Sequence, residues 1–244
     1  MAWNAAAASW PPALLKPSAP DAMRRHDLVY LQRDAAFATP CAENGDAYWQ
    51  AARDWVAAGR PLVAARQPAG GQRLLLGLSL PLALQRKRLT IEVDRSAVAE
   101  IRRPISLGRC LSRLPAEQAA VLRRLEAGAA ACGADLGVFG SLSWEALSGE
   151  SYRHAESDID LICDVATPAQ CDALLALLHQ AAGALPCRLD GEIRFPDGDA
   201  VAWQEFAAQS NRPEARVLVK GQQEVGLRPV QDLLATLEEA CCHA

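Results

Sequence analysis

One stretch near the middle of the chain constrains its fold more than any other. Leu136–Phe139 is a short apolar run that predicts a strand, and Gly140-Ser141 turns the chain into a predicted helix. A second strand with alternating character is predicted over Ser157–Val165, and it carries Asp158 and Asp160. This order of elements places a glycine-containing turn and two carboxylates in neighbouring parts of one domain.

The spacing of Asp158 and Asp160 predicts a metal site. Residues i and i+2 of a strand point to the same face, so the two carboxylates lie side by side. Two carboxylates this close repel each other unless a cation lies between them. Mg²⁺ takes oxygen ligands from one or two carboxylates and from substrate phosphates. Such a pair alone also occurs in many acidic loops, so the prediction depends on its context.

Gly140-Ser141 supplies that context. A glycine between a strand and a helix lets the backbone approach a phosphate group. The amides that follow, the hydroxyl of Ser141 and the helix N-terminus can bind anions. We therefore expect Gly140 and Ser141 to bind substrate phosphates.

Two later strands carry further candidates. In the predicted strand Cys187–Phe195, Asp190 and Glu192 share one face, and we favour Asp190 as the third carboxylate of the site, with Glu192 as the alternative. Lys220 ends the predicted strand over residues 216–220 and is a candidate contact to a triphosphate. A solvated surface lysine is the alternative interpretation of Lys220.

The rest of the pattern predicts an α+β protein in two parts. Residues 1–22, rich in alanine and proline, are expected to be a disordered and dispensable tail. A small N-terminal α+β domain is predicted over residues 23–106, and the catalytic domain over residues 107–244. In the second part the pattern predicts a helix with Ala119, Leu122, Leu125 and Ala129 on one face, a helix capped by Thr167, a strand over residues 200–206 and a final helix over residues 229–240.

Composition narrows the class of protein. The net charge of −4 gives no general reason to expect nucleic-acid binding. The eight cysteines form no C-x-x-C pair, which argues against zinc. No apolar run approaches the roughly 20 residues that span a bilayer, so we expect a cytoplasmic protein without a membrane partner. Arg86-Lys87-Arg88 is a basic cluster that is either a solvated turn or a contact to phosphates or to an acidic partner protein.

The order strand, Gly-Ser, helix and D-x-D strand resembles the polymerase-β-like nucleotidyltransferases. That resemblance implies a catalytic domain with a mixed sheet flanked by helices. It also implies two metal ions that assist in-line attack on an α-phosphate while pyrophosphate leaves. Sixteen residues separate Ser141 from Asp158, which is a longer gap than that pattern usually has.

Three stretches together resemble one family, the phosphoribosyl-dephospho-CoA transferase of malonate decarboxylase, also called its holo-acyl-carrier-protein synthase. They are Arg25-His26-Asp27-Leu28, the segment from Gly140 to Leu161 and Asp190-Gly191-Glu192 with Trp203. The resemblance implies that a serine of the apo acyl-carrier subunit attacks the α-phosphate of 2'-(5''-triphosphoribosyl)-3'-dephospho-CoA and that pyrophosphate leaves.

The same resemblance implies roles for the candidate residues. Asp158 and Asp160 would bind Mg²⁺, and Asp190 would complete the metal site or help to deprotonate the serine. Gly140 and Ser141 would hold the leaving phosphates. Two alternatives remain open at this point, which are nucleotide transfer to a small hydroxylated molecule, as in antibiotic nucleotidyltransferases, and a non-catalytic assembly factor with the same fold.

Overall fold

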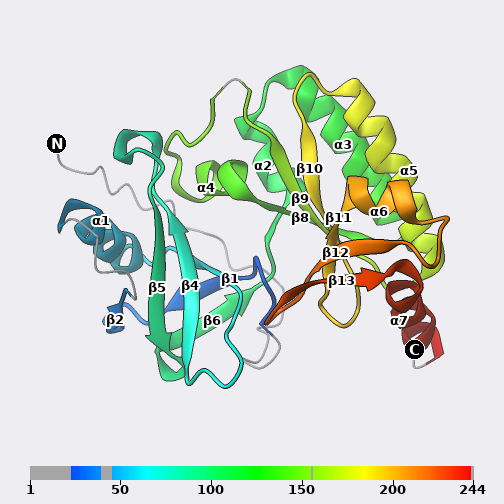
Figure 1. The fold of residues 1–244 in the computed structure, drawn as a ribbon. Helices are drawn as coiled ribbons and strands as arrows, with labels where there is room; N and C mark the ends of the chain where they lie inside the picture. Colours follow the sequence, from blue (N-terminus) through cyan, green and yellow to red (C-terminus); the bar gives the residue numbers. More distant parts are fainter. Residues whose placement is uncertain (1–22, 40–45, 155, 243–244) are drawn as a thin grey trace. The chain divides into compact units, whose positions relative to one another are not determined.

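The computed structural model describes residues 23–39, 46–154 and 156–242, and the chain forms two compact units. Figure 1 shows both units, which divide between Arg103 and Pro104. The tail expected over residues 1–22 lies outside the described residues. No helix in the described part of the chain is both long and apolar enough to cross a membrane.

The first unit contains an antiparallel sheet of six strands in the order β2-β5-β4-β3-β1-β6. Alternate leucines of the central strand β4 (Arg73–Ser79) are buried, as the alternation in the sequence requires. The other elements are β1 (Leu28–Leu31), β2 (Phe37–Ala38), α1 (Asp46–Ala57), β3 (Leu62–Ala64), η2 (Leu82–Leu84), β5 (Arg88–Asp94), η3 (Arg95–Ala97) and β6 (Val98–Arg102).

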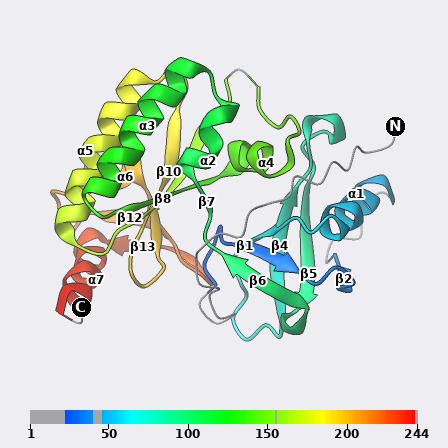
Figure 2. The ribbon, with the colours of Figure 1, turned by 180° about the vertical axis from the view of Figure 1, so that it is seen from behind.

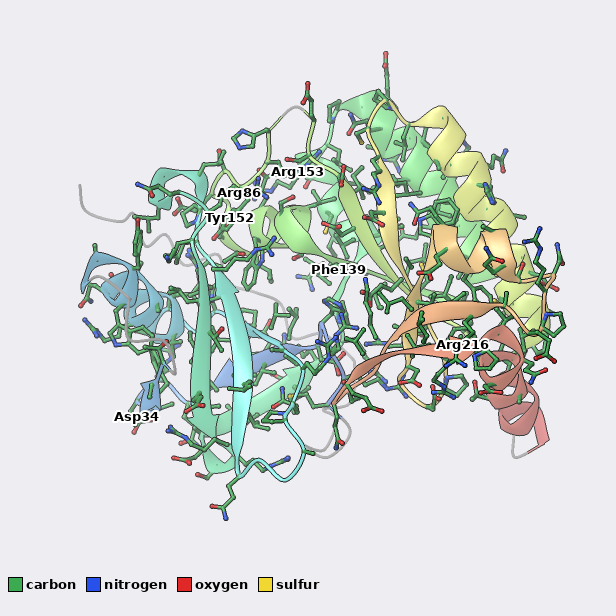
Figure 3. All side chains as sticks on the ribbon, in the orientation of Figure 1. Asp34, Arg86, Phe139, Tyr152, Arg153 and Arg216 are labelled. Carbon is green, nitrogen blue, oxygen red and sulfur yellow. The ribbon has the colours of Figure 1, made fainter. Side chains whose placement is uncertain are left out.

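The basic cluster Arg86-Lys87-Arg88 lies on an exposed turn of this unit, between η2 and β5. Gln85 and Arg86 both have positive φ angles, of 59° and 53°. Figure 3 labels Arg86 on this turn.

The second unit contains a seven-stranded mixed sheet in the order β13-β12-β11-β10-β9-β8-β7. Within the described residues, β9 (Ile159–Asp164) and β10 (Leu189–Arg194) form its one parallel pair. The other strands are β7 (Ile105–Ser106), β8 (Asp135–Phe139), β11 (Ala200–Ala202), β12 (Arg216–Lys220) and β13 (Val225–Pro229).

Two long helices, α3 (Ala116–Ala131) and α5 (Pro168–Ala184), pack against each other and cover one face of this sheet (Figures 1 and 2). The predicted face of α3 is buried, and Thr167 Oγ1 accepts a hydrogen bond from the amide of Gln170 as a helix N-cap. The remaining helices of the unit are α2 (Leu107–Cys110), η4 (Leu111–Arg113), α4 (Gly140–Ser148), α6 (Trp203–Gln209) and α7 (Val230–Cys242).

The α+β class and the mixed sheet flanked by helices are confirmed, but one predicted strand is wrong. Residues 200–206 form a strand only as far as Ala202, and α6 begins at Trp203. Trp203 and Phe206 lie three residues apart and are both buried, which suits one face of a helix. The indole Nε1 of Trp203 donates to the Leu189 carbonyl at 3.2 Å, so the ring also fixes the start of β10. In the second unit, β7 and β13 have no counterpart among the predicted strands.

Candidate active site

The centre of the second unit's sheet brings three predicted elements into one row. Phe139 at the end of β8 lies beside Asp160 of β9, and Asp160 lies beside Asp190 of β10. Figure 3 labels Phe139 where β8 runs into α4. Neighbours in register point to the same face of a sheet, so the carboxylates of Asp160 and Asp190 lie on one face, next to the start of α4.

That face is the one opposite α5. Cys163 of β9 lies near Cys171 of α5, and burial raises the pKa of the Cys163 thiol. Since successive residues of a strand face opposite sides, Ile159, Leu161 and Cys163 face the helices and Asp160 faces away from them. The same alternation that builds the core therefore exposes the carboxylate.

The backbone conformation of Gly140 and its contact with Asp160 both require a glycine at this position. Its φ angle is +69°, a left-handed conformation that glycine adopts without strain. A Cβ at this position would also overlap the Asp160 carboxylate, which lies against the glycine backbone. Only glycine lets that carboxylate approach the first residue of α4.

The start of α4 is suited to an anion. The residue before it, Phe139, supplies no side-chain hydrogen bond to the first amides of the helix. Ser143 Oγ donates a hydrogen bond to the Gly140 carbonyl at 2.8 Å, and this bond stabilises the first turn of α4. Ser141 is half-buried at the helix start. Helix N-termini with exposed donors attract phosphate groups.

Asp158 lies directly before β9, although the predicted strand over residues 157–165 included it. The amide of Ile159 donates to the carbonyl of Arg188, the residue directly before β10, at 3.0 Å. The pairing of the two segments therefore extends one residue beyond the start of β10. Arg188 Nη2 lies 3.1 Å from Asp190 Oδ2, and its Nη1 lies 3.9 Å from Asp158 Oδ2. One guanidinium therefore connects two of the predicted carboxylates, and the sequence interpretation missed it.

The alternative third carboxylate, Glu192, has a different environment. Its side chain is only 4% exposed, and Lys220 Nζ donates to its Oε1 at 3.0 Å. Asp190 is 28% exposed and lies beside Asp160. The position of Asp190 therefore suits a contact with metal or substrate, while Glu192 and Lys220 engage each other.

A second buried ion pair continues the same face. Arg194 donates to Asp164 through two nitrogens, at 2.6 and 2.7 Å, and Arg194 is 1% exposed. These residues are neighbours in register on β10 and β9. Paired in this bidentate way, they link the two parallel strands beyond the carboxylates. Gly191 makes the close approach possible, because a Cβ there would overlap the Leu161 backbone.

The loop between α4 and β9 is tied to α4 by Glu145. Its Oε1 accepts hydrogen bonds from the amides of Tyr152 and Arg153, both at 2.9 Å. The Tyr152 ring stacks on Trp144 with centroids 6.3 Å apart. Figure 3 labels Tyr152 and Arg153 in this loop. Within this long connection, Tyr152 and Arg153 are therefore held to α4 by hydrogen bonds.

The stretch Arg25-His26-Asp27 belongs to the first unit and has a structural role there. Asp27 is fully buried, and its Oδ2 accepts a hydrogen bond from the Arg24 amide at 2.9 Å. The same oxygen lies 3.5 Å from Nη1 of Arg103, the last residue of that unit. This carboxylate thus fixes the turn that leads into β1.

The donor set suits Mg²⁺, since Asp158, Asp160 and Asp190 supply hard oxygen ligands at adjacent positions. Among the described residues, no three His, Cys, Asp or Glu side chains are grouped closely enough to hold a metal ion. The Arg188 guanidinium instead lies between two of these carboxylates as a stand-in cation. Residue types and positions fit the metal, and the side chains would have to converge on it.

Family models match both units of the chain. The model of the phosphoribosyl-dephospho-CoA transferase MdcG C-terminal domain matches residues 106–231, and that of the N-terminal domain matches residues 24–104. The chain is 35% identical, over 84% of its length and 93% of the relative's, to a phosphoribosyl-dephospho-CoA transferase of Xanthomonas axonopodis pv. citri.

Relatives of the same name occur in other bacteria. The chain is 37% identical to one of Pseudomonas aeruginosa over 67% of this chain and 75% of that protein. It is 31% identical to one of Bradyrhizobium diazoefficiens over 74% and 80% of the two lengths. No solved structure matches the chain significantly.

Proposed function

The chain belongs to the phosphoribosyl-dephospho-CoA transferase MdcG family, and from that premise we propose which group it transfers and to what acceptor. The donor is 2'-(5''-triphosphoribosyl)-3'-dephospho-CoA, and the acceptor is a serine of the apo acyl-carrier subunit of malonate decarboxylase. The observation that carries this proposal is the row of Asp160 and Asp190 in register beside Gly140 at the start of α4. It combines acidic ligands for a cation with a helix start for phosphates.

The reaction is a nucleotidyl-type transfer. The serine Oγ forms a bond to the α-phosphorus of the donor, and the bond from that phosphorus to the oxygen bridging to the β-phosphate breaks. Pyrophosphate leaves, the carrier gains a phosphodiester, and the serine proton passes to a base, for which Asp190 is the candidate on this face.

Asp158, Asp160 and Asp190 would hold Mg²⁺, which when bound neutralises phosphate charge and favours the deprotonated hydroxyl. Gly140 and Ser141 would bind the leaving β- and γ-phosphates through the helix start. An ammonium group carries three donors, so the bond of Lys220 to Glu192 is compatible with an additional phosphate contact.

The test is a reconstitution with purified components. The protein, Mg²⁺, the triphosphoribosyl precursor and the apo carrier subunit are mixed, and the carrier is weighed by mass spectrometry. We expect the carrier to gain the mass of one phosphoribosyl-dephospho-CoA group and one pyrophosphate to appear for each modified carrier. A carrier with its acceptor serine replaced by alanine is the control, and chelation of the metal should stop the reaction. An unmodified wild-type carrier would refute the proposal.

A further inference from the structure

Arg188 lies close to two carboxylates of the candidate site, those of Asp158 and Asp190. It stands immediately before β10, and its backbone carbonyl is fixed by the Ile159 amide at 3.0 Å. Its guanidinium lies 3.1 Å from an oxygen of Asp190 and 3.9 Å from an oxygen of Asp158. The Arg188 side chain is 64% exposed, so the backbone is anchored while the charged end lies in solvent.

A guanidinium in this position supplies the charge that a metal ion would supply. Without a cation, the carboxylates of Asp158 and Asp190 would repel each other across the two strands. Arginine stays protonated at all physiological pH values, so it cannot give way to a metal ion by losing its proton. It has to move, and its exposed side chain has room in solvent to do so.

Phosphate oxygens are the natural next partner for the displaced group. A guanidinium binds carboxylate and phosphate with the same bidentate geometry. A triphosphate held by a cation at Asp158 and Asp190 would bring its oxygens within reach of a side chain that begins two residues before Asp190. The exchange of one anionic partner for another keeps the charge of Arg188 neutralised throughout.

We propose that Arg188 is a phosphate-binding residue that bridges Asp158 and Asp190 in the metal-free site and moves to the substrate's phosphates when a divalent cation takes its place. This inference rests on the proposed function for its metal and triphosphate. It predicts that Arg188 weakens metal binding to the free enzyme and strengthens polyphosphate binding to the metal-loaded enzyme. A residue that merely supports the fold would not shift these two affinities in opposite directions.

The test uses the full-length protein and two measurements that need no turnover. Mn²⁺ binding is followed by electron paramagnetic resonance, and binding of inorganic tripolyphosphate at saturating Mn²⁺ is followed by calorimetry. For Arg188→Gln we expect Mn²⁺ to bind about three- to tenfold more tightly, since a competing cation is removed. We expect tripolyphosphate to bind roughly tenfold more weakly, because a charge-assisted pair is lost. Arg188→Lys should lie between wild type and Arg188→Gln in both measurements.

Arg212→Gln is the matched control, since it removes the same charge from an exposed position after α6 and should change neither affinity more than about twofold. Unchanged or weaker Mn²⁺ binding by Arg188→Gln would overturn the proposal, and so would unchanged tripolyphosphate binding. A wild-type protein that binds no Mn²⁺ would overturn it as well. Failure of the proposed function is a separate result, because it shows as an unmodified carrier in the reconstitution.

Discussion

At the scale of single residues, Asp160 has the most constrained position of the candidate site. It lies between Phe139 and Asp190 in register, and its carboxylate lies against Gly140. Asn has nearly the same shape as Asp but carries no charge, so Asp160→Asn separates the charge of this residue from its packing.

We expect Asp160→Asn to lower the rate of carrier modification by roughly a thousandfold or more, because a metal ligand that stabilises phosphate charge is lost. The thermal midpoint should stay within about 2 °C of wild type, which corresponds to at most about 1 kcal/mol. Pyrophosphate release and circular dichroism measure the two effects. Asp172→Asn, exposed on α5, is the control and should keep full activity. Full pyrophosphate release by Asp160→Asn would disprove the assignment.

Gly140 provides a test of stability at the same place. Gly140→Ala puts a side chain at a φ of +69° and against the Asp160 carboxylate. We expect the free energy of unfolding to fall by about 2–4 kcal/mol, from backbone strain and crowding together. Urea unfolding measures this change.

The matched control is Gly183→Ala in α5, where a Cβ would meet no atom within 4 Å. There alanine should leave stability unchanged or raise it by up to about 1 kcal/mol, because alanine favours helix. Equal effects of the two substitutions would show that the contact with Asp160 does not constrain residue 140.

The sequence predicts a site residue when its neighbours along the chain form the pattern, and it misses contacts between residues that are far apart along the chain. Strand alternation and the glycine turn are local, so they predict the positions of Gly140, Asp158 and Asp160 from their own neighbours. Arg188 is thirty residues from Asp158 and meets it only through the parallel register of β9 and β10. The difference between Asp190 and Glu192 likewise depends on β12, two strands away from β10 in the sheet, which brings Lys220 to Glu192. Long-range pairings of this kind leave no local pattern.

At the scale of elements, the parallel pair of β9 and β10 carries the site, and a buried ion pair fixes it. Arg194 and Asp164 lie opposite each other at the far ends of these strands. Burial of Arg194 removes it from water, so the bidentate bond to the Asp164 carboxylate compensates its charge where water cannot. The strand predicted over residues 200–206 was wrong from Trp203 onward, where α6 begins. Over a segment this short, the spacing of apolar residues does not distinguish a strand from a helix.

We expect Asp164→Ala to lower the free energy of unfolding by about 3 kcal/mol, because it leaves the buried Arg194 without its carboxylate. The double variant Asp164→Ala with Arg194→Met should recover part of that loss, since it removes the uncompensated charge as well. Denaturant unfolding of both variants and of Asp172→Asn, an exposed control, measures the effect. A double variant no more stable than Asp164→Ala would contradict the charge argument.

At the scale of the whole molecule, every candidate site residue lies in one unit. The residues from Gly140 to Lys220 that are proposed to bind metal and phosphates all belong to the unit that begins at Pro104. That unit has its own sheet, covered on one face by α3 and α5, and its own buried core. The second unit therefore contains a complete sheet, a core and all of the residues proposed to bind metal without residues 1–103.

We expect a fragment of residues 104–244 to unfold cooperatively on heating and to bind Mn²⁺ within about threefold of the full chain, since a domain with its own core folds alone. Circular dichroism and electron paramagnetic resonance measure the two properties. A fragment of residues 133–244 is the control, because it lacks α3, whose Leu122 and Leu125 are buried against the unit, and it should not unfold cooperatively. If the longer fragment also melts without cooperativity, the second unit depends on the first unit for its fold, and the proposed metal site then requires the whole chain.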